Sequence, residues 1–357
     1  MTSLVELVED RRIVICTGTG GVGKTTTAAV LALEAARRGR RAVVVTIDPA
    51  KRLADTLGLG ELSNTPSLIE GDWPGELWAM MLDTKTTFDE LIATYAADGA
   101  QAERILGNRF YRNISGALSG TQEYMAGEKL HELHESGRFD LVVVDTPPTR
   151  HALDFLDAPA RLTRFLDHKL YRALMTPTKA YLKAVNVAAT AVAKAIGKVV
   201  GGEALEDGLS FFAAFEGMEQ GFRDRAARVQ ALLTDPATAY VLVASPRADT
   251  VAEATYFAER LAQSALPVAA LVVNRVHPRF GKGLGPAARK RATAAVGTPL
   301  EGLARNLAQF RTMADGEERH LVDLAERVQP APVARVPFLP HDVHDLDTLA
   351  EIASYLF

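Results

Sequence analysis

Apolar positions along the 357 residues follow two different spacings. Short runs rich in β-branched residues, typical of buried parallel strands, lie at residues 12–17, 42–47, 76–82, 141–145, 240–244, 268–274 and 333–336. Between these runs, apolar residues recur every three or four positions, which predicts helices at 26–38 and 248–264 and helical stretches over 86–137. Strands that alternate with helices predict an α/β fold, a doubly wound and mostly parallel sheet of about seven or eight strands.

Residues 159–233 depart from this alternation, because no run among them predicts a strand. Apolar residues at helical spacing form three stripes: Leu162, Phe165, Leu166, Leu170 and Leu174; Tyr181, Val185, Val192, Ile196 and Val199; Phe212, Phe215, Met218, Phe222, Val229 and Leu233. We therefore expect residues 1–158 and 234–357 to form the core domain and 159–233 to form an inserted helical subdomain. The stripes either pack within the protein or form a binding face, and the pattern leaves both open.

Charge and cysteine content narrow the class of protein. The net charge of −4 gives no overall basic field, so we expect no nucleic-acid partner. The single cysteine, Cys16, excludes a disulfide and a cysteine-based zinc or arsenite site, which suits a reducing cytoplasm. Residues 1–12 lack the basic start and apolar core of a signal peptide, and no run of about 18 apolar residues occurs. We therefore expect a cytoplasmic protein without a membrane-spanning helix.

One segment carries a strong local charge. Residues 161–200 contain eight basic residues against Asp167 alone. A basic amphipathic stretch of this kind either forms a solvated face or attracts an anionic membrane surface or an acidic partner. Peripheral membrane contact is therefore one expectation for this segment.

The most specific motif lies between the first predicted strand and an alanine-rich helix. Gly18, Gly23, Lys24 and Thr25 match the P-loop pattern G-x-x-x-x-G-K-[ST]. Glycines in such a loop let backbone N–H groups face phosphate oxygens at a helix N-terminus. We expect nucleotide contacts from Gly20, Gly21, Val22, Gly23, Lys24, Thr25 and Thr26. Lys24 would reach the β- and γ-phosphates, and the Thr25 hydroxyl would ligate Mg²⁺.

Polar residues end three of the predicted strands. Asp48 follows the second strand, Asp145 ends the fourth and Asn274 the sixth. Ligands of open parallel sheets bind outside the carboxyl ends of the strands. Asp145 follows four apolar residues, as in a Walker B motif, so we expect it to hold Mg²⁺ through a water molecule. Capping of a proline-containing turn is the alternative for Asp145 and, more strongly, for Asp48.

Three segments in this order resemble those of the arsenite-pump and tail-anchored-protein-targeting ATPases. They are the P-loop G-x-G-G-V-G-K-T-T from Gly18, D-P-A-K-R-L-A-D from Asp48 and D-T-P-P-T-R-H-A-L-D-F-L from Asp145. The resemblance implies ATP as substrate and Mg²⁺ as cofactor, with Asp48 and Lys24 as catalytic residues. It further implies that residues 145–151 form a nucleotide-responsive switch, that Asn274 reads the adenine, and that Pro337 and Phe338 pack on the base.

The chain departs from that family at one position. The family carries a signature lysine directly after the first P-loop glycine, which crosses a dimer interface to the partner's nucleotide, whereas this chain has Thr19. Cations supplied in trans contribute about 10³ to 10⁵ in rate to phosphoryl transfer. Three outcomes are open: slow intrinsic hydrolysis, an arginine from elsewhere in the same role, or a heterodimer whose paralogous ATPase subunit donates the lysine. Our hypothesis is the heterodimer.

Together these features predict an ATP hydrolase whose dimer opens and closes with nucleotide state and gates a hydrophobic groove in residues 159–233. Such a groove would target or chaperone apolar client segments of membrane proteins. One alternative is a weakly catalytic or non-catalytic nucleotide-binding subunit of a heterodimer. Another is a partitioning or positioning ATPase, which the long insertion and the D-T-P-P-T segment disfavour.

The Asp48→Asn variant tests the role implied for Asp48. Asparagine keeps the size of the side chain but cannot accept a proton from water, so we expect turnover to fall by at least about 100-fold and the ATP dissociation constant to change by less than about threefold. Titration with a fluorescent ATP analogue and an assay of phosphate release measure the two quantities. A loss of binding as large as the loss of turnover would contradict this role.

Overall fold

The computed structural model describes residues 3–48, 50, 52–114, 121–147, 154–168, 207–208, 210–211, 213–280 and 285–357. Its contacts divide the chain into two compact units. The first contains Met1–Met81, Ser136–Leu153 and Pro236–Phe357, and the second contains Leu82–Glu135 and Asp154–Asp235. Residues 82–135, which the sequence analysis assigned to the core domain, thus group with the helices after residue 153. The separate subdomain at 159–233 stays a prediction.

The first unit is built on one eight-stranded sheet in the order β3-β4-β2-β5-β1-β6-β7-β8. Its strands are β1 (Ile13–Gly18), β2 (Arg41–Thr46), β3 (Ser67–Ile69), β4 (Glu76–Met81), β5 (Leu141–Asp145), β6 (Thr238–Ala244), β7 (Val268–Val276) and β8 (Val333–Pro337). All pair in parallel except β3, a short edge strand antiparallel to β4. The predicted α/β fold is confirmed, and β3 is the one strand of this sheet that the hydrophobic pattern missed.

Every residue of β1 and β5 is buried, as expected for central parallel strands covered on both faces. Their register places three chain positions side by side at the carboxyl edge of the sheet. Asp145 pairs with Cys16 of β1 on one side and with Thr46 of β2 on the other. The edge at which β1, β2 and β5 end is therefore where polar side chains from distant segments meet.

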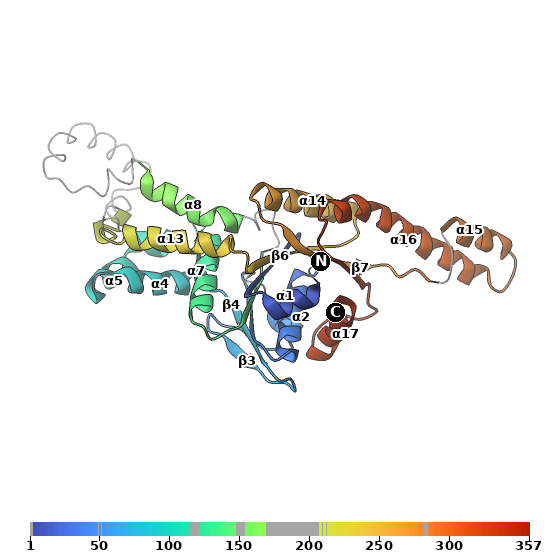
Figure 1. Ribbon diagram of the computed structural model, residues 1–357, viewed down its shortest axis with the longest axis horizontal. Helices are drawn as coiled ribbons and strands as arrows, with labels where there is room; N and C mark the ends of the chain where they lie inside the picture. Colours follow the sequence, from blue (N-terminus) through green and yellow to red (C-terminus); the bar gives the residue numbers. More distant parts are fainter. Residues whose placement is uncertain are drawn as a thin grey trace. The chain divides into compact units, whose positions relative to one another are not determined.

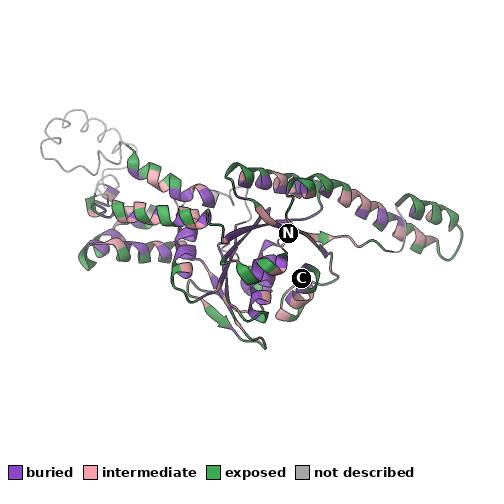
Figure 2. Ribbon diagram, viewed as in Figure 1, coloured by how far each residue is buried: buried purple, intermediate pink, exposed green. Residues whose placement is uncertain are grey.

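Helices cover both faces of this sheet (Figure 1). On one face, α1 (Leu4–Asp10), α2 (Lys24–Arg37) and α17 (Leu346–Leu356) share a core with alternate residues of the strands. On the other, α14 (Ala248–Gln263) packs on β1, β6 and β7, and α16 (Glu301–Arg327) packs on α14 and β7. The short helices α3 (Arg52–Thr56) and α15 (Gly285–Ala294) pack on α2 and α16. Figure 2 shows how fully α2 is buried in comparison with α15.

The second unit is helical throughout its described residues. Its helices are α4 (Thr84–Tyr95), α5 (Gly99–Leu106), α6 (Arg109–Ile114), α7 (Thr121–Glu135), α8 (Asp154–Asp167) and α13 (Glu219–Leu233). They enclose a separate aromatic core in which Phe215 contacts Phe211 and Phe222. In the described part of the third predicted stripe, the buried side chains are Phe215, Met218, Phe222, Val229 and Leu233. These residues therefore pack inside the unit.

Other members of the stripes remain outside the described residues: Leu170, Leu174, Tyr181, Val185, Val192, Ile196, Val199 and Phe212. Most of the basic segment lies there as well, from residue 169 onward. Of the first stripe, Leu166 is buried whereas Phe165 is 52% exposed. None of the described helices is both long enough and apolar enough to cross a membrane.

Leu31 on α2 offers a direct test of the core. Its side chain is fully buried, whereas Leu303 on α16 is 70% exposed. We expect Leu31→Ala to lower the free energy of unfolding by about 2–5 kcal/mol, because it removes buried apolar area and leaves a cavity. The matched variant Leu303→Ala should change it by less than about 0.5 kcal/mol. Denaturant titration followed by circular dichroism measures both, and equal effects would contradict the packing described here.

Candidate functional site

The loop between β1 and α2 has the backbone of a phosphate-binding loop. Gly18, Gly21 and Gly23 have φ angles of +154°, +75° and +96°, a region that favours glycine. A Cβ atom on Gly18 would lie 2.1 Å from the carbonyl oxygen of Val243, and one on Gly23 would lie 2.1 Å from Nδ2 of Asn274. The loop thus lies against the ends of β6 and β7, and α2 begins directly after it at Lys24.

Lys24 points back into this loop. Its side chain is buried, and Nζ donates a hydrogen bond to the carbonyl oxygen of Thr19 at 2.7 Å. Burial lowers the pKa of the Lys24 ammonium group, while the carboxylates of Asp145 and Asp48 act in the opposite direction. The amine therefore lies within the loop, and its contact with phosphate stays a prediction.

Asp145 gathers two hydroxyl groups at the carboxyl edge of the sheet. Its Oδ2 accepts hydrogen bonds from Oγ1 of Thr25 at 2.8 Å and from Oγ1 of Thr46 at 2.9 Å. Its other oxygen, Oδ1, is buried and has no hydrogen-bond partner among the described residues. Burial raises the pKa of Asp145 to about 6, against the influence of the two hydroxyl groups and Lys24. A buried carboxylate oxygen without a partner, beside a threonine hydroxyl, fits the oxygen ligands that Mg²⁺ prefers.

Asp48 lies in the same pocket as the loop. This pocket of about 600 Å³ is lined by Gly20, Gly21, Gly23, Lys24, Thr25, Thr26, Asp48, Arg52, Asp55, Thr56, Thr146 and Arg275. The Asp48 side chain is largely buried, accepts a hydrogen bond from the backbone N–H of Ala50 at 3.0 Å and lies 3.6 Å from Nη1 of Arg52. The structure therefore brings Asp48 together with Lys24 and Thr25 in one pocket, while its catalytic role stays a prediction.

The expected adenine-binding residues lie at the ends of β7 and β8. Asn274 donates from Nδ2 to the carbonyl oxygen of Val22 at 2.9 Å, and its Oδ1 accepts from the backbone N–H of Arg275 at 2.9 Å. Its amide thus ties β7 to the P-loop, and its reading of adenine stays a prediction. Phe338, directly after Pro337, is 54% exposed and stacks on His277 with ring centroids 5.6 Å apart. An exposed ring is available to a base, and this role is likewise untested.

Two residues at this site, Thr46 and Arg275, were missed by the sequence analysis. Thr46 reaches Asp145 through the β2–β5 register, which the sequence does not reveal. Thr146, which the sequence analysis placed in the predicted switch, donates from Oγ1 to the carbonyl oxygen of Cys16 at 2.8 Å. Arg275 gave no signal, because only its backbone conformation turns it toward the loop. Within the predicted switch, residues 148–151 lie outside the described part, as does Pro49.

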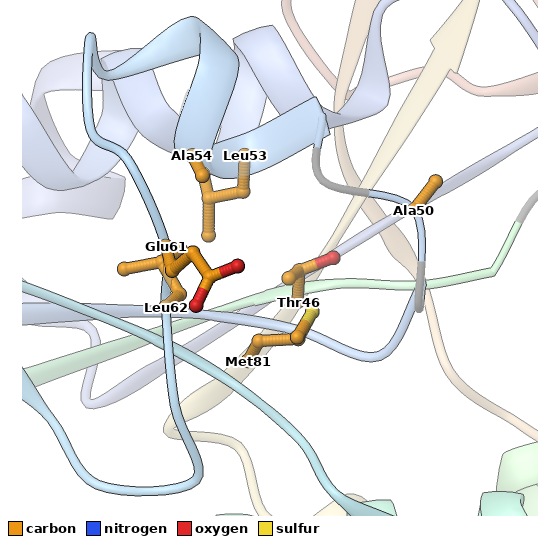
Figure 3. Close-up of a pocket in the computed structure, with 7 residues that line it drawn as sticks. All are labelled: Thr46, Ala50, Leu53, Ala54, Glu61, Leu62 and Met81. Atoms are coloured by element: carbon orange, nitrogen blue, oxygen red, sulfur yellow. The ribbon is translucent and has the colours of Figure 1, made fainter.

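A smaller pocket of about 130 Å³ lies between Thr46 and α3 (Figure 3). Leu53, Leu62 and Met81 give it an apolar wall, and the carboxylate of Glu61 points into it. Because the Thr46 hydroxyl also donates to Asp145, this pocket shares a wall with the candidate metal site.

The phosphate-binding loop, the strand-end carboxylate and the parallel sheet define a P-loop nucleoside triphosphatase fold. More narrowly, the chain belongs to the anion-transporting ATPase family, whose model matches residues 11–289. The resemblance stated from the three motifs is thereby confirmed. The match includes the P-loop, Asp48, Asp145 and Asn274 but ends before Pro337 and Phe338.

Individual relatives support the same family. The chain is 32% identical over 290 residues to the Uncharacterized protein SCO2128 of Streptomyces coelicolor, covering 79% of this chain and 68% of that protein. It is 31% identical over 156 residues to ATPase asna-1 of Caenorhabditis elegans, covering 41% of this chain and 45% of that protein. It is 32% identical over 152 residues to ATPase GET3 of Pyricularia oryzae, covering 42% and 43%. The chain thus spans less than half the length of the two relatives named as ATPases.

The pKa of Asp145 generates a prediction for protein free of nucleotide and metal. Because this pKa is raised from 3.8 to about 6, the native state binds a proton more tightly than the unfolded state does. The free energy of unfolding should therefore fall as the pH rises from about 4 through about 6, by an amount on the order of 3 kcal/mol.

Asp145→Asn removes this ionisation, so we expect the variant to lose that part of the pH dependence and to exceed the wild type in stability at about pH 8. Urea titrations in EDTA at several pH values measure the effect, with the exposed Asp72→Asn as the matched control. A wild-type profile that rises over the same interval and is unchanged in Asp145→Asn would contradict the assignment.

Proposed function

We propose that this protein is a Mg²⁺-dependent ATPase. The observation that carries the proposal is the convergence of Lys24, Thr25 and Asp145 at the N-terminus of α2, with Asp48 in the same pocket. Backbone N–H groups and the helix N-terminus would hold the phosphates, and Lys24 would neutralise charge on the transferred group. Thr25 and Asp145 would hold Mg²⁺, which supplies charge neutralisation at the phosphates when bound.

Asp48 is the proposed carboxylate for the attacking water. It lines the pocket just after β2 ends. Among the described residues that line this pocket, Asp55 is the only other carboxylate that could accept a proton. The exposed guanidinium group of Arg52 lies 3.6 Å from the Asp48 carboxylate and leaves it open to the pocket. A carboxylate that lines the pocket can accept a proton from water or orient it.

The proposed cycle couples nucleotide binding to the opening and closing of a dimer, in the cytoplasm. Support comes from the family and from relatives named ATPase GET3 and ATPase asna-1. Residues 159–233 would form the helical subdomain that binds a client or partner, with apolar segments of membrane proteins as clients. The exposed ring of Phe165 on α8 supports an apolar binding face, whereas the buried side chains of α13 serve packing.

A second candidate function rests on Thr19. Its side chain is 4% exposed, and its hydroxyl has no hydrogen-bond partner among the described residues. Because threonine is uncharged, position 19 presents no positive charge to a partner subunit. A weakly catalytic subunit of a heterodimer, completed by the lysine of a paralogous ATPase subunit, would account for this residue.

Phosphate release by the purified chain, alone and mixed with a paralogous subunit, separates these functions. We expect saturable binding of Mg-ATP by the chain alone, and turnover that rises by about 10³-fold or more when the second subunit is added. Lys24→Ala in this chain should abolish the binding, with Lys290→Ala on α15 as the control. Equal turnover with and without the second subunit would refute the heterodimer, and absence of Mg-ATP binding would refute the ATPase itself.

A further inference from the structure

Arg275 occupies an unusual place at the phosphate pocket. Three cationic side chains line that pocket, and two of them have assigned contacts: Lys24 bonds to Thr19, and Arg52 pairs with Asp48. The third, Arg275, donates from Nη1 to the carbonyl oxygen of Gly21 at 3.0 Å. No carboxylate among the described residues pairs with it, whereas the nearby Arg279 pairs with Asp315. Among the described residues, its side chain therefore bonds only to a neutral carbonyl group.

The backbone of Arg275 is held in a costly conformation. Its φ angle is +61°, in the left-handed region that side-chain-bearing residues rarely adopt. The kink coincides with an irregularity in the pairing of β7 with β8, which falls between Val273 and Val276 of β7. Irregularities of this kind at strand ends often re-aim a side chain. Here the kink directs the guanidinium group of Arg275 toward the P-loop.

The kink and the P-loop are joined at two further points. The Asn274 amide accepts from the backbone N–H of Arg275 and donates to the carbonyl oxygen of Val22. The backbone of residue 275 is thus fixed relative to the loop by bonds that do not involve its own side chain. Within the described part of the chain, the side chain of Arg275 bonds only to the carbonyl oxygen of Gly21. It can therefore leave this carbonyl for a stronger acceptor without disturbing the backbone.

Phosphate is the stronger acceptor. Arginine presents five donors in a planar fork, and charge-assisted bonds to phosphate are about twice as strong as bonds to neutral groups. Thr19 gives the loop no positive charge at that position, so Lys24 is the loop's own cation. We propose that Arg275 binds phosphate oxygens of the nucleotide and so supplies, within the same chain, a cation that Thr19 does not provide. This inference rests on the proposed function, because it assumes a nucleoside triphosphate in the pocket.

Nucleotide binding by three variants tests the proposal without relying on turnover. Arg275→Gly removes the side chain and suits a positive φ angle, Arg275→Lys keeps the charge, and Arg275→Gln keeps a neutral donor for Gly21. We expect the dissociation constant for Mg-ATP to rise about 10- to 100-fold in the Gly and Gln variants and less than about fivefold in the Lys variant. Titration of a fluorescent ATP analogue at two salt concentrations measures these values, with Arg279→Gly as the matched control.

Salt dependence and stability distinguish a phosphate contact from a structural clamp. If Arg275 contacts phosphate, the salt dependence of Mg-ATP binding should weaken in the Gly and Gln variants, because one ionic contact is lost. The melting temperature of the nucleotide-free Gly variant should equal or exceed that of the wild type, since the strained backbone is relieved.

Wild-type affinity and salt dependence in Arg275→Gln would overturn the proposal in favour of a clamp on Gly21. Affinity within about twofold of the wild type in Arg275→Gly would overturn any role at the nucleotide. Both results leave the ATPase proposal standing. Failure of the wild type to bind Mg-ATP would instead remove the proposed function together with this inference.

Discussion

Close contact between the P-loop and the ends of β6 and β7 is the constraint on which the site depends. Gly18 lies against the Val243 carbonyl and Gly23 against the Asn274 amide so closely that a Cβ atom at either position would collide. Because no side chain intervenes, the loop can turn its backbone inward and start α2 directly at Lys24. The position of the lysine, the orientation of the helix N-terminus and the reach of Arg275 all follow from this approach.

The sheet holds the carboxylate of Asp145 in a buried position at the site. Parallel pairing on both sides brings Cys16 and Thr46 level with it, and Thr25 reaches it from the start of α2. Burial there is unfavourable for a carboxylate, as its raised pKa shows. The same burial and the nearby carboxylate raise the pKa of the Cys16 thiol, so this cysteine stays protonated beside the site. A divalent cation would turn the unfavourable burial of Asp145 into a binding interaction.

The second unit has a different physical basis. Its described helices enclose a chain of aromatic contacts that runs from Tyr111 through Phe211 and Phe215 to Phe222. When a helix buries its apolar stripe within its own unit, that stripe is no longer available to a client. Phe165 on α8 is, by contrast, an apolar side chain of this unit that is 52% exposed.

The sequence alone determined the class of fold, the P-loop and the strand-end acids, because hydrophobic periodicity and glycine spacing are local signals that survive without tertiary contacts. It missed β3, whose three residues become a strand only by pairing with β4. It likewise missed Thr46 and Arg275. Which hydroxyl meets Asp145 depends on the register between β2 and β5, and the direction of Arg275 depends on a backbone kink held by Asn274. Both are long-range properties of the packed sheet, so only the tertiary structure decided them.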